Sequence, residues 1–334
     1  MKALVTGATG FLGAATVARL RAEGVTVRAL MRAPGTPCAA DERCIGDLRD
    51  ADALARAVDG VDWVIHAGAR VSTSGAWEEF EAVNVAATAA IIERAKAAGV
   101  RRIVHVSSLS VYAVPVDGAT VTEESAYDDG GEDRGFYARS KLAADRVASD
   151  AMRAGAPLTI VRPGLIYGPG RTPPLARRAA SLGPLRVLLA SPDYLLPLAY
   201  VENVADAIVL SAQTPGAIGR AYTIVDVHAR QADYARLYKQ QSGATWTPVY
   251  VPLAALRLAA SAAERSFAML GRRSPLTRHQ VERTLRSATF VTRRAHDELG
   301  WQPRVPLEEA LRRSFAARRP PSAEGPTAAV HSPA

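Results

Sequence analysis

Short apolar runs alternate with longer stretches of helical spacing through the first half of the chain. The apolar runs predict strands at residues 2–6, 25–31, 43–45, 61–66, 102–107 and 158–162. The longer stretches predict helices at residues 11–23, 50–58, 77–98 and 136–153. Strands that alternate with helices in this way indicate an α/β fold with a parallel, doubly wound sheet. Such a sheet binds its ligands beyond the carboxyl ends of its strands.

The pattern changes after Pro163. Prolines divide the following stretch into loops and short elements, at positions 163, 169, 173, 174, 184, 192 and 197. Later residues again predict regular elements: a helix at 201–213, a strand at 221–225, and helical stretches around 231–242, 252–270, 276–286 and 307–317.

This change in pattern predicts two units. We expect a sheet domain at residues 1–163, to which residues 200–226 return. A smaller substrate-binding lobe is expected at residues 164–199 and 227–317. Residues 318–334 are rich in Pro, Ala and Ser, and this composition predicts a disordered tail.

The positive charge of the chain comes mainly from arginine. Its 41 basic residues include only four lysines, and the net charge is +8. An Ala- and Arg-rich composition can reflect a coding bias, and no segment combines a basic patch with interleaved aromatics. We therefore expect no nucleic-acid partner. The six histidines show no metal-ligand spacing, so no metal site is expected either.

Cysteine usage and apolar stretches bear on location. Cys38 and Cys44 form no disulfide framework, which fits a reducing compartment and predicts a cytoplasmic protein. We expect no signal peptide, because an expected strand and a glycine turn occupy the N-terminal residues where one would lie. Charged residues interrupt the apolar stretch at 251–270, so no transmembrane segment is expected. An amphipathic helix that packs on the core or lies on a membrane surface fits better.

A glycine-rich loop follows the first expected strand. Gly7, Gly10 and Gly13 have the spacing GxxGxxG, one residue longer than the common dinucleotide fingerprint. Glycine permits a tight turn, close approach of the backbone to a pyrophosphate and close packing of helix on sheet. The N-terminus of the following helix offers amide donors and a positive dipole to phosphates. This position favours a dinucleotide site over a purely structural turn.

The end of the second expected strand indicates which dinucleotide binds. No acidic residue stands at its tip to accept from a ribose 2′-hydroxyl, and Arg32 is placed to bind a 2′-phosphate. Such a contact is worth about 1.5–3 kcal/mol, so we predict NADP(H) in preference to NAD(H). The alternative is that Arg32 faces solvent. Asp47, after the third strand, either reaches the adenine amine or caps the helix at 50–58.

Tyr137 and Lys141 lie four residues apart in the expected helix at 136–153, so they share one helix face. A phenol beside a fixed ammonium can have its pKa lowered from about 10 toward neutrality. That would make Tyr137 a general acid or base near pH 7. The alternative is a surface tyrosine beside a solvated lysine.

The glycine loop and the Tyr137–Lys141 pair together resemble the short-chain dehydrogenase/reductase superfamily. Further strings resemble its extended branch, the NAD-dependent epimerase/dehydratase-like proteins, at residues 106–112, 162–170, 201–207 and 299–303. The resemblance covers roughly residues 1–316 and implies a Rossmann-type NAD(P)-binding domain with a small C-terminal substrate lobe. Departures are slight, such as Gly68 in the string that is often His-x-Ala-Ala, and Asp145 where a glutamate is usual.

The resemblance implies roles for individual residues. Ser108, rather than Ser107 or Ser110, would hold the substrate oxygen. Lys141 would bind the nicotinamide ribose and lower the pKa of Tyr137. Tyr137 would give a proton to the oxygen as hydride reaches carbon, or take it in reverse.

Other residues are expected to bind cofactor or substrate. Asn84 is expected to support the cofactor pocket, and the turn at 163–167 to contact the nicotinamide side. The full set of expected cofactor-binding residues is Gly7, Thr9, Gly10, Phe11, Leu12, Gly13, Arg32, Asp47, Leu48, Ala67, Ala69, Asn84, Tyr137, Lys141, Pro163, Gly164 and Ile166. The expected substrate contacts are Ser110, Tyr167 and Arg171.

Within the extended branch, the chain is most similar to 3β-hydroxysteroid dehydrogenases and dihydroflavonol reductases. The strand ending at Arg32 looks like the NADP-reading strand of the flavonoid reductases, and no carboxylate stands directly beside Ser108. Residues 171–198 are rich in Leu, Pro and Ala and contain no string like the nucleotide-phosphate segment of the sugar enzymes. We therefore expect an NADP(H)-dependent oxidoreductase that interconverts a ketone and a secondary alcohol on a small, rather apolar metabolite.

Two other functions stay open. One is a sugar-nucleotide 4-epimerase that retains NAD. The other is a non-catalytic, NADP(H)-sensing regulatory protein, although such proteins commonly lose the tyrosine or the lysine. The resemblance also leaves open a homodimer and, through residues 252–270, a peripheral membrane contact.

Overall fold

The computed structural model describes residues 1–72, 74–129, 135–171, 179–182, 184–272, 274, 277–278, 281 and 285–317. Its centre is a parallel sheet of seven strands in the order β12-β7-β5-β4-β1-β2-β3. These strands are β1 (Lys2–Thr6), β2 (Thr26–Met31), β3 (Glu42–Ile45), β4 (Trp63–His66), β5 (Arg102–Val106), β7 (Leu158–Pro163) and β12 (Ala221–Ile224). The strand order reverses between β1 and β4, which opens a ligand crevice at their carboxyl ends. The predicted doubly wound α/β fold is confirmed.

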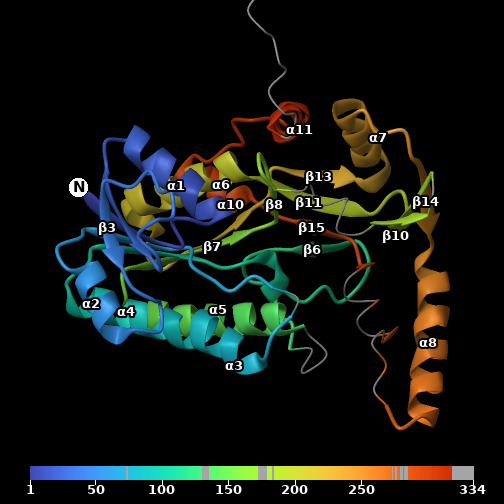
Figure 1. Ribbon diagram of the computed structural model, residues 1–334, viewed down its shortest axis with the longest axis horizontal. Helices are drawn as coiled ribbons and strands as arrows, with labels where there is room; N and C mark the ends of the chain where they lie inside the picture. Colours follow the sequence, from blue (N-terminus) through green and yellow to red (C-terminus); the bar gives the residue numbers. More distant parts are fainter. Residues whose placement is uncertain are drawn as a thin grey trace, which may run out of the picture.

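Helices cover both faces of this sheet (Figure 1). One face carries α1 (Phe11–Ala22), α6 (Val201–Gln213) and α10 (Arg293–Leu299). The other carries α2 (Ala51–Val58), α4 (Ala87–Ala97) and α5 (Phe136–Arg153). Since α6 and β12 belong to this layered unit, the chain leaves the sheet domain after β7 and later returns to it.

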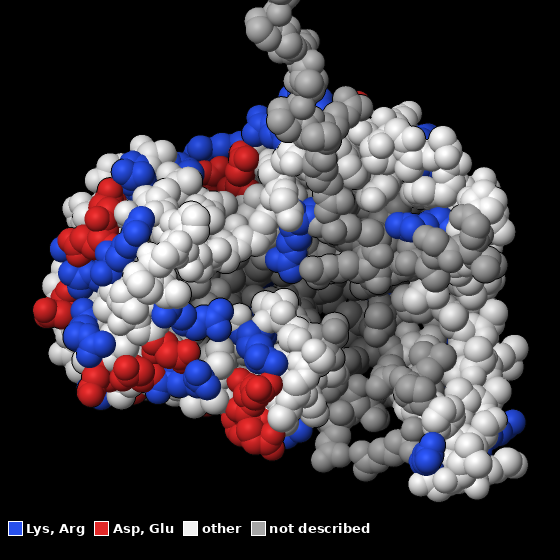
Figure 2. Space-filling view, viewed as in Figure 1, with Lys and Arg blue, Asp and Glu red and all other residues white. Residues whose placement is uncertain are grey.

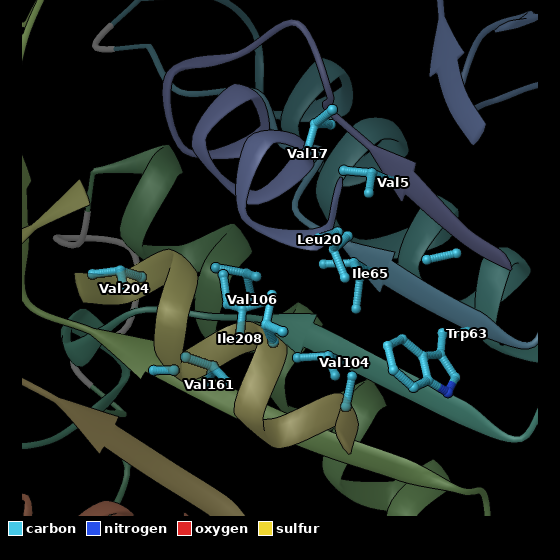
Figure 3. Close-up of a cluster of buried hydrophobic side chains, with 14 of the residues drawn as sticks. Val5, Val17, Leu20, Trp63, Ile65, Val104, Val106, Val161, Val204 and Ile208 are labelled. Atoms are coloured by element: carbon cyan, nitrogen blue, oxygen red, sulfur yellow. The ribbon is translucent and has the colours of Figure 1, made fainter. Parts of the chain in front are cut away.

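Successive residues of β1 enter different cores, which explains why its sequence is continuously apolar. Ala3 and Val5 join a cluster with side chains of α1 and α6, and Figure 3 shows that cluster. Leu4 lies in a second cluster with side chains of α2 and α4. Each fully buried Val, Leu or Ile side chain stabilises the fold by about 1.5–3 kcal/mol. The sheet is therefore held rigidly between two apolar layers, and its strand ends make a fixed platform.

A second lobe forms beyond the carboxyl edge of the sheet (Figure 1). It contains two small sheets, β13-β11-β8 and β14-β10-β9. Their strands are β8 (Leu165–Tyr167), β9 (Ala179–Leu182), β10 (Leu185–Leu189), β11 (Leu195–Tyr200), β13 (Val227–Arg230) and β14 (Thr247–Val251). The helices of the lobe are α7 (Gln231–Ser242), α8 (Leu253–Met269) and α11 (Leu307–Ala316). Buried tyrosines dominate its core, among them Tyr167, Tyr200 and Tyr234.

A short parallel pair joins the two parts of the molecule. Strand β6 (Ala119–Val121) comes from the sheet domain, and β15 (Ala288–Phe290) comes from late in the chain. Both strands contribute to an apolar cluster with the turn Leu109–Val111, which follows β5. Segments distant in sequence therefore meet beside the carboxyl end of β5.

One sequence expectation about elements needs correction. Residues 77–98 do not form one continuous α-helix: α3 (Trp77–Phe80) is followed by a π-helical segment (Glu81–Ala86) and then α4. A π turn holds an extra residue, which apolar spacing does not reveal. The proline-rich stretch was expected as loops and short elements, and its described part holds short strands, of which β11 has six residues with Pro197 in its middle. Proline lacks the N–H that a ladder uses, so its presence argued against a strand there.

Other elements were not predicted or lie outside the described residues. The helix α10 and the strands β13, β14 and β15 were not predicted. The expected helix around 276–286 falls largely on residues outside the described part of the chain, and the expected tail at 318–334 falls wholly outside it.

Candidate active site

The glycine loop between β1 and α1 requires glycine for steric reasons. Gly7 has φ +69°, and a Cβ there would lie 2.7 Å from the Cα of Gly68. A Cβ on Gly13 would lie 2.0 Å from the carbonyl oxygen of Gly7. The N–H of Gly10 donates to that same carbonyl at 2.8 Å, which closes the turn. Helix and loop therefore pack more closely than any larger residue allows.

The N-terminus of α1 is suited to an anion. Its N-cap is Gly10, which has no side chain to occupy the first amides, and the first turn contains no acidic residue. Thr9 and Gly10 are exposed, and Phe11 and Leu12 are half-buried. Exposed amides with the positive end of a helix dipole bind phosphate.

The tips of β2 and β3 carry the residues expected to read the adenosine. Arg32 directly follows β2 and is exposed. Asp47 accepts from Nε and Nη2 of Arg49 at 2.8 and 3.1 Å, and these bonds hold the pKa of its carboxyl below the usual value. The charge of Arg32 also lowers the pKa of Asp47, so Arg32 is near enough to Asp47 for their charges to interact. Sequence reasoning missed Arg49 as a second cation here.

The alternative role considered for Asp47 is wrong. The helix α2 is capped by Asp50, whose Oδ1 accepts from the backbone N–H groups of Asp52 and Ala53 at 2.9 and 3.2 Å. Asp47 is engaged by Arg49 instead. The neighbouring Leu48 lies close to Gly68, the residue that contacts Gly7 of the glycine loop. A Cβ on Gly68 would meet Cδ1 of Leu48 at 2.8 Å.

The Tyr137–Lys141 pair lies in the first two turns of α5, with Tyr137 half-buried and Lys141 buried. The Nζ of Lys141 donates to the carbonyl oxygen of Val106 at 2.7 Å, at the end of β5. Burial lowers the pKa of Lys141 to about 8, although the charge of Asp145 acts to raise it. The lysine is thus fixed at the carboxyl edge of the sheet.

Ser108 follows β5 by two residues and begins the 3₁₀ turn Leu109–Val111. Its Oγ accepts from the backbone N–H of Ser110 at 3.2 Å, and its side chain is half-buried. Because that bond uses an acceptor position, the hydroxyl proton is left to donate to another group. Helix α5 packs against this turn, so Ser108 lies on the same edge as Lys141.

Asn84 lies in the π-helical segment and is buried. Its Oδ1 accepts from the N–H of Arg70 at 2.7 Å, and its Nδ2 donates to the carbonyl of Arg70 at 3.1 Å. The Nδ2 also donates to the Oγ of Ser140 at 2.8 Å, and Ser140 lies between Tyr137 and Lys141 on α5. This placement ties α5 to the loop after β4, where the half-buried Ala69 lies beside Arg70.

Below the site lies a buried histidine that sequence reasoning did not single out as functional. The Nδ1 of His66 contacts Oγ1 of Thr6 at 2.8 Å, and its Nε2 contacts Oγ1 of Thr88 at 3.0 Å. Burial, aided by the charge of Lys141, lowers the pKa of His66 to about 3, so it is neutral at pH 7. The next residue, Ala67, is half-buried at the carboxyl end of β4. This network joins the glycine-loop strand to the helix that carries Asn84.

The turn after β7 packs against the second lobe. Pro163 ends β7, and the N–H of Gly164 donates to the carbonyl of Ile224 at 2.9 Å. A Cβ on Gly164 would lie 2.4 Å from the carbonyl oxygen of Pro197, so this position needs glycine. Ile166 is half-buried and packs on the cluster of α1 and α6. Figure 2 shows the surface hollowed between the sheet domain and the second lobe.

The three expected substrate contacts are not brought together. Ser110 is half-buried in the turn begun by Ser108. Tyr167 is fully buried in the core of the second lobe, edge-on to Tyr200 with ring centroids 5.6 Å apart. The guanidinium of Arg171 stands 5.2 Å over the ring of Phe11, next to the glycine loop. The three side chains therefore lie in three different parts of the structure: the Ser108 turn, the core of the second lobe and the side of the glycine loop.

Comparison with known proteins identifies the family. Residues 3–224 match the model of the NAD dependent epimerase/dehydratase family. The 2-alkyl-3-oxoalkanoate reductase of Stenotrophomonas maltophilia (strain K279a) is 33% identical over 335 residues, covering 95% of this chain and 99% of that protein. The 3 beta-hydroxysteroid dehydrogenase/Delta 5-->4-isomerase of Mycobacterium tuberculosis (strain CDC 1551 / Oshkosh) is 30% identical over 328 residues, covering 93% of this chain and 88% of that protein.

A solved structure extends the comparison to the fold. MoeE5 in complex with UDP-glucuronic acid and NAD matches with a TM-score of 0.72 at 25% identity, covering 95% of this chain and 99% of that chain. The fold and site define an NAD(P)-dependent oxidoreductase of the extended short-chain dehydrogenase/reductase type. The chain belongs to the NAD-dependent epimerase/dehydratase family, which confirms the resemblance seen in its sequence.

Two further properties concern the residues that the structure describes. Among them, no helix is both long and apolar enough to cross a membrane. The same residues contain no group of three or more His, Cys, Asp or Glu side chains that could hold a metal ion. On the face in Figure 2, basic and acidic side chains are interspersed over the sheet domain.

Proposed function

We propose that this protein interconverts a ketone and a secondary alcohol on a small, rather apolar metabolite, with NADP(H) as hydride carrier. One observation supports this most strongly: Lys141, one turn after Tyr137, is anchored to Val106, two residues before Ser108. The anchor gathers an ammonium, a phenol and a hydroxyl at the carboxyl edge of the sheet. That set can orient a carbonyl and give it a proton.

Each residue has a distinct part in the proposed reaction. Ser108 donates its hydroxyl proton in a hydrogen bond to the substrate oxygen and orients it. Tyr137 gives its phenolic proton to that oxygen during reduction and takes it back during oxidation. Lys141 supplies a fixed positive charge that favours the phenolate left on Tyr137. The dinucleotide, when bound, supplies or accepts the hydride.

The residues around the glycine loop support a pyrophosphate-bearing cofactor. The steric requirement for glycine at positions 7 and 13 leaves the backbone able to approach phosphate closely. Arg32, with Arg49 nearby on Asp47, makes the adenosine end of the crevice cationic. A 2′-phosphate carries charge that this end can bind, which supports NADP(H) over NAD(H).

The names of two relatives support an apolar substrate. The two curated relatives are named for an oxoalkanoate and a hydroxysteroid, both largely hydrocarbon molecules. A substrate that combines one ketone or hydroxyl with hydrocarbon agrees with both names.

A panel of ketones tests the proposal. We expect the purified protein to oxidise NADPH when given 3-oxoalkanoate derivatives or 3-ketosteroids, and to use NADH less efficiently. Loss of NADPH absorbance with each ketone, compared with a ketone-free blank, measures this. Failure of every ketone and every secondary alcohol in the panel would count against the proposal.

A sugar-nucleotide 4-epimerase that retains NAD is the second candidate. The family name and the UDP-glucuronic acid and NAD bound to MoeE5 favour it. It predicts NAD that co-purifies with the protein and saturable binding of UDP-sugars, which mass spectrometry and calorimetry detect. A non-catalytic NADP(H) sensor is a third candidate, and the presence of Ser108, Tyr137 and Lys141 weighs against it.

Location and partners complete the proposal. The free thiols of Cys38 and Cys44 suit a cytoplasmic protein. Helix α8 exposes Leu258 and Met269, so a peripheral membrane contact is a further prediction. Flotation of the protein with lipid vesicles tests it. A homodimer is also predicted, and the molar mass measured by light scattering tests it.

A further inference from the structure

One buried arginine lies beneath the proposed site and touches several segments that carry site residues. Arg162, in β7, donates from Nε and Nη2 to both carboxylate oxygens of Asp145 at 3.0 and 2.7 Å. Its Nη1 donates to the hydroxyl oxygen of Tyr112 at 2.7 Å. Its Nη2 also donates to the hydroxyl oxygen of Tyr127 at 2.9 Å. The planar guanidinium therefore uses all three of its nitrogens.

Each main partner of Arg162 belongs to a segment with a role in the proposed reaction. Asp145 lies on α5 one turn beyond Lys141. Tyr112 ends the turn Leu109–Val111, which Ser108 begins. Arg162 thus makes two hydrogen bonds to helix α5, through Asp145, and one to the Ser108 turn, through Tyr112. These bonds fix the helix and the turn relative to each other.

The third segment is the chain of Arg162 itself. It continues directly into Pro163 and Gly164, the turn that packs against Pro197 of the second lobe. Side-chain exposure is 4% for Arg162 and 0% for Asp145, so solvent does not loosen the arrangement. Guanidinium forks hold such geometry because their donors are rigidly planar.

The pair also affects the charge at Lys141. Burial acts to raise the pKa of Asp145, but the bonds and charge of Arg162, together with bonds from Ser107 and Tyr127, outweigh burial and hold that pKa below the usual value. The resulting carboxylate acts to raise the pKa of Lys141 against the effect of burial. Arg162 thus keeps Asp145 ionised, and Asp145 in turn supports the protonated lysine.

Stability alone is a weak reason for this arrangement. A buried ion pair often contributes no more to stability than apolar residues of the same volume, because both charges lose their hydration. A pair that instead holds two segments of a site in register has a functional reason to be there.

We propose that Arg162 is a positioning residue that fixes the Ser108 turn against the Tyr137–Lys141 helix. This inference rests on the proposed function, since it assigns Arg162 to the same proton-transfer site. Its loss should therefore reduce turnover without removing the cofactor.

Arg162→Lys tests the fork, because it keeps the charge and loses the planar set of donors. We expect kcat to fall about 100-fold, as a displacement of about 1 Å at a reacting group does. The Kd for NADPH, measured by fluorescence, should change less than about threefold. Tyr112→Phe removes the hydroxyl that accepts from Arg162 and that also lies 3.4 Å from Oγ1 of Thr223, and it should lower kcat about tenfold.

Arg19→Lys is the matched control. Arg19 forms a partly buried ion pair with Asp206 that joins α1 to α6 and touches no segment of the Ser108–Lys141 edge. We expect this variant to lose stability and to keep the wild-type kcat. A wild-type kcat in a folded Arg162→Lys or Tyr112→Phe variant overturns the proposal. If Arg162→Lys does not fold, Tyr112→Phe decides.

A second readout separates this proposal from the proposed function. The ionisation of Tyr137 is measured as tyrosinate absorbance, subtracting the same titration of the matching Tyr137→Phe protein. In Asp145→Asn, Lys141 loses the carboxylate that raises its pKa, so a smaller fraction of Lys141 is protonated at a given pH. The midpoint of the Tyr137 titration should therefore move to higher pH by about one unit. This titration needs no substrate, so it holds even if no ketone is reduced. An unmoved midpoint overturns the link through Asp145.

Discussion

The ammonium of Lys141 donates to the carbonyl oxygen of Val106 at 2.7 Å, and this bond joins helix α5 to the end of strand β5. Val106 is followed within two residues by Ser108, and Lys141 is preceded by one turn by Tyr137. The bond therefore sets the relative position of the three residues proposed to hold and protonate the substrate oxygen.

Tyr137→Phe removes only a hydroxyl group. We expect kcat to fall at least about 100-fold, because general acid catalysis contributes about 10²–10⁴-fold. The Kd for NADPH should stay near that of the wild type, since the phenyl ring keeps its packing. Stopped-flow turnover and fluorescence titration measure the two quantities. A variant with near-wild-type kcat would remove Tyr137 from the mechanism.

The pH dependence of turnover follows from Lys141. Burial lowers its pKa to about 8, so the side chain is protonated below that pH and neutral above it. Reduction should therefore fall as pH rises through about 8, by about tenfold at one unit above the pKa. A kcat profile with saturating NADPH shows this limb.

Lys141→Arg provides the comparison for that profile, because a guanidinium stays charged over the whole range. Whatever rate this variant retains should not fall near pH 8. A wild-type rate that stays level to pH 10 is inconsistent with a role for the lysine charge.

Arg32→Ala tests the cofactor preference. The loss of a contact worth about 1.5–3 kcal/mol should lower kcat/KM for NADPH by roughly tenfold to 100-fold. The value for NADH should change little, since NADH lacks the 2′-phosphate. Arg220→Ala is a suitable control, because Arg220 is an exposed arginine that directly precedes the opposite edge strand β12 and pairs with Glu298. Equal losses with both cofactors would argue that Arg32 acts through structure.

Gly13→Ala tests the packing of the phosphate loop. A Cβ there would lie 2.0 Å from the carbonyl oxygen of Gly7, so the loop or α1 must move. Overpacking of this kind costs about 1–3 kcal/mol of stability, and NADPH binding should weaken at least about tenfold. Gly216→Ala, where a Cβ meets nothing within 4 Å, should leave both unchanged. Urea denaturation and fluorescence titration measure the two effects.

The regular elements of the sheet domain were predictable because their signals are local. The helix at 136–153 and the helix at 201–213 agree with α5 and α6 at both ends. Continuous apolar runs predicted the central strands, since both sheet faces are covered and most of their positions are buried, whereas the edge strand β3 has only half-buried and exposed positions. The second lobe was harder, because β11 contains Pro197 and its partners come from distant parts of the chain.

The site divides in the same way. The glycine loop and the Tyr137–Lys141 pair are visible in short strings, and the structure places both at the carboxyl edge of the sheet. The partners of Arg162 lie 17 to 50 residues away in sequence, so no local pattern showed the network. Asn84 was expected to support the cofactor pocket, but the π segment that turns it toward Ser140 was not foreseen.

The most direct test of the account is the fate of the hydride. NADPH that carries deuterium at the transferred position is incubated with the protein and a 3-oxoalkanoate or 3-ketosteroid, and the products are analysed by mass spectrometry. We predict one deuterium on the new carbinol carbon for each NADP⁺ released, and no transfer by Tyr137→Phe. Tightly retained NAD with an inverted UDP-sugar, and no net transfer to any ketone, would contradict the account.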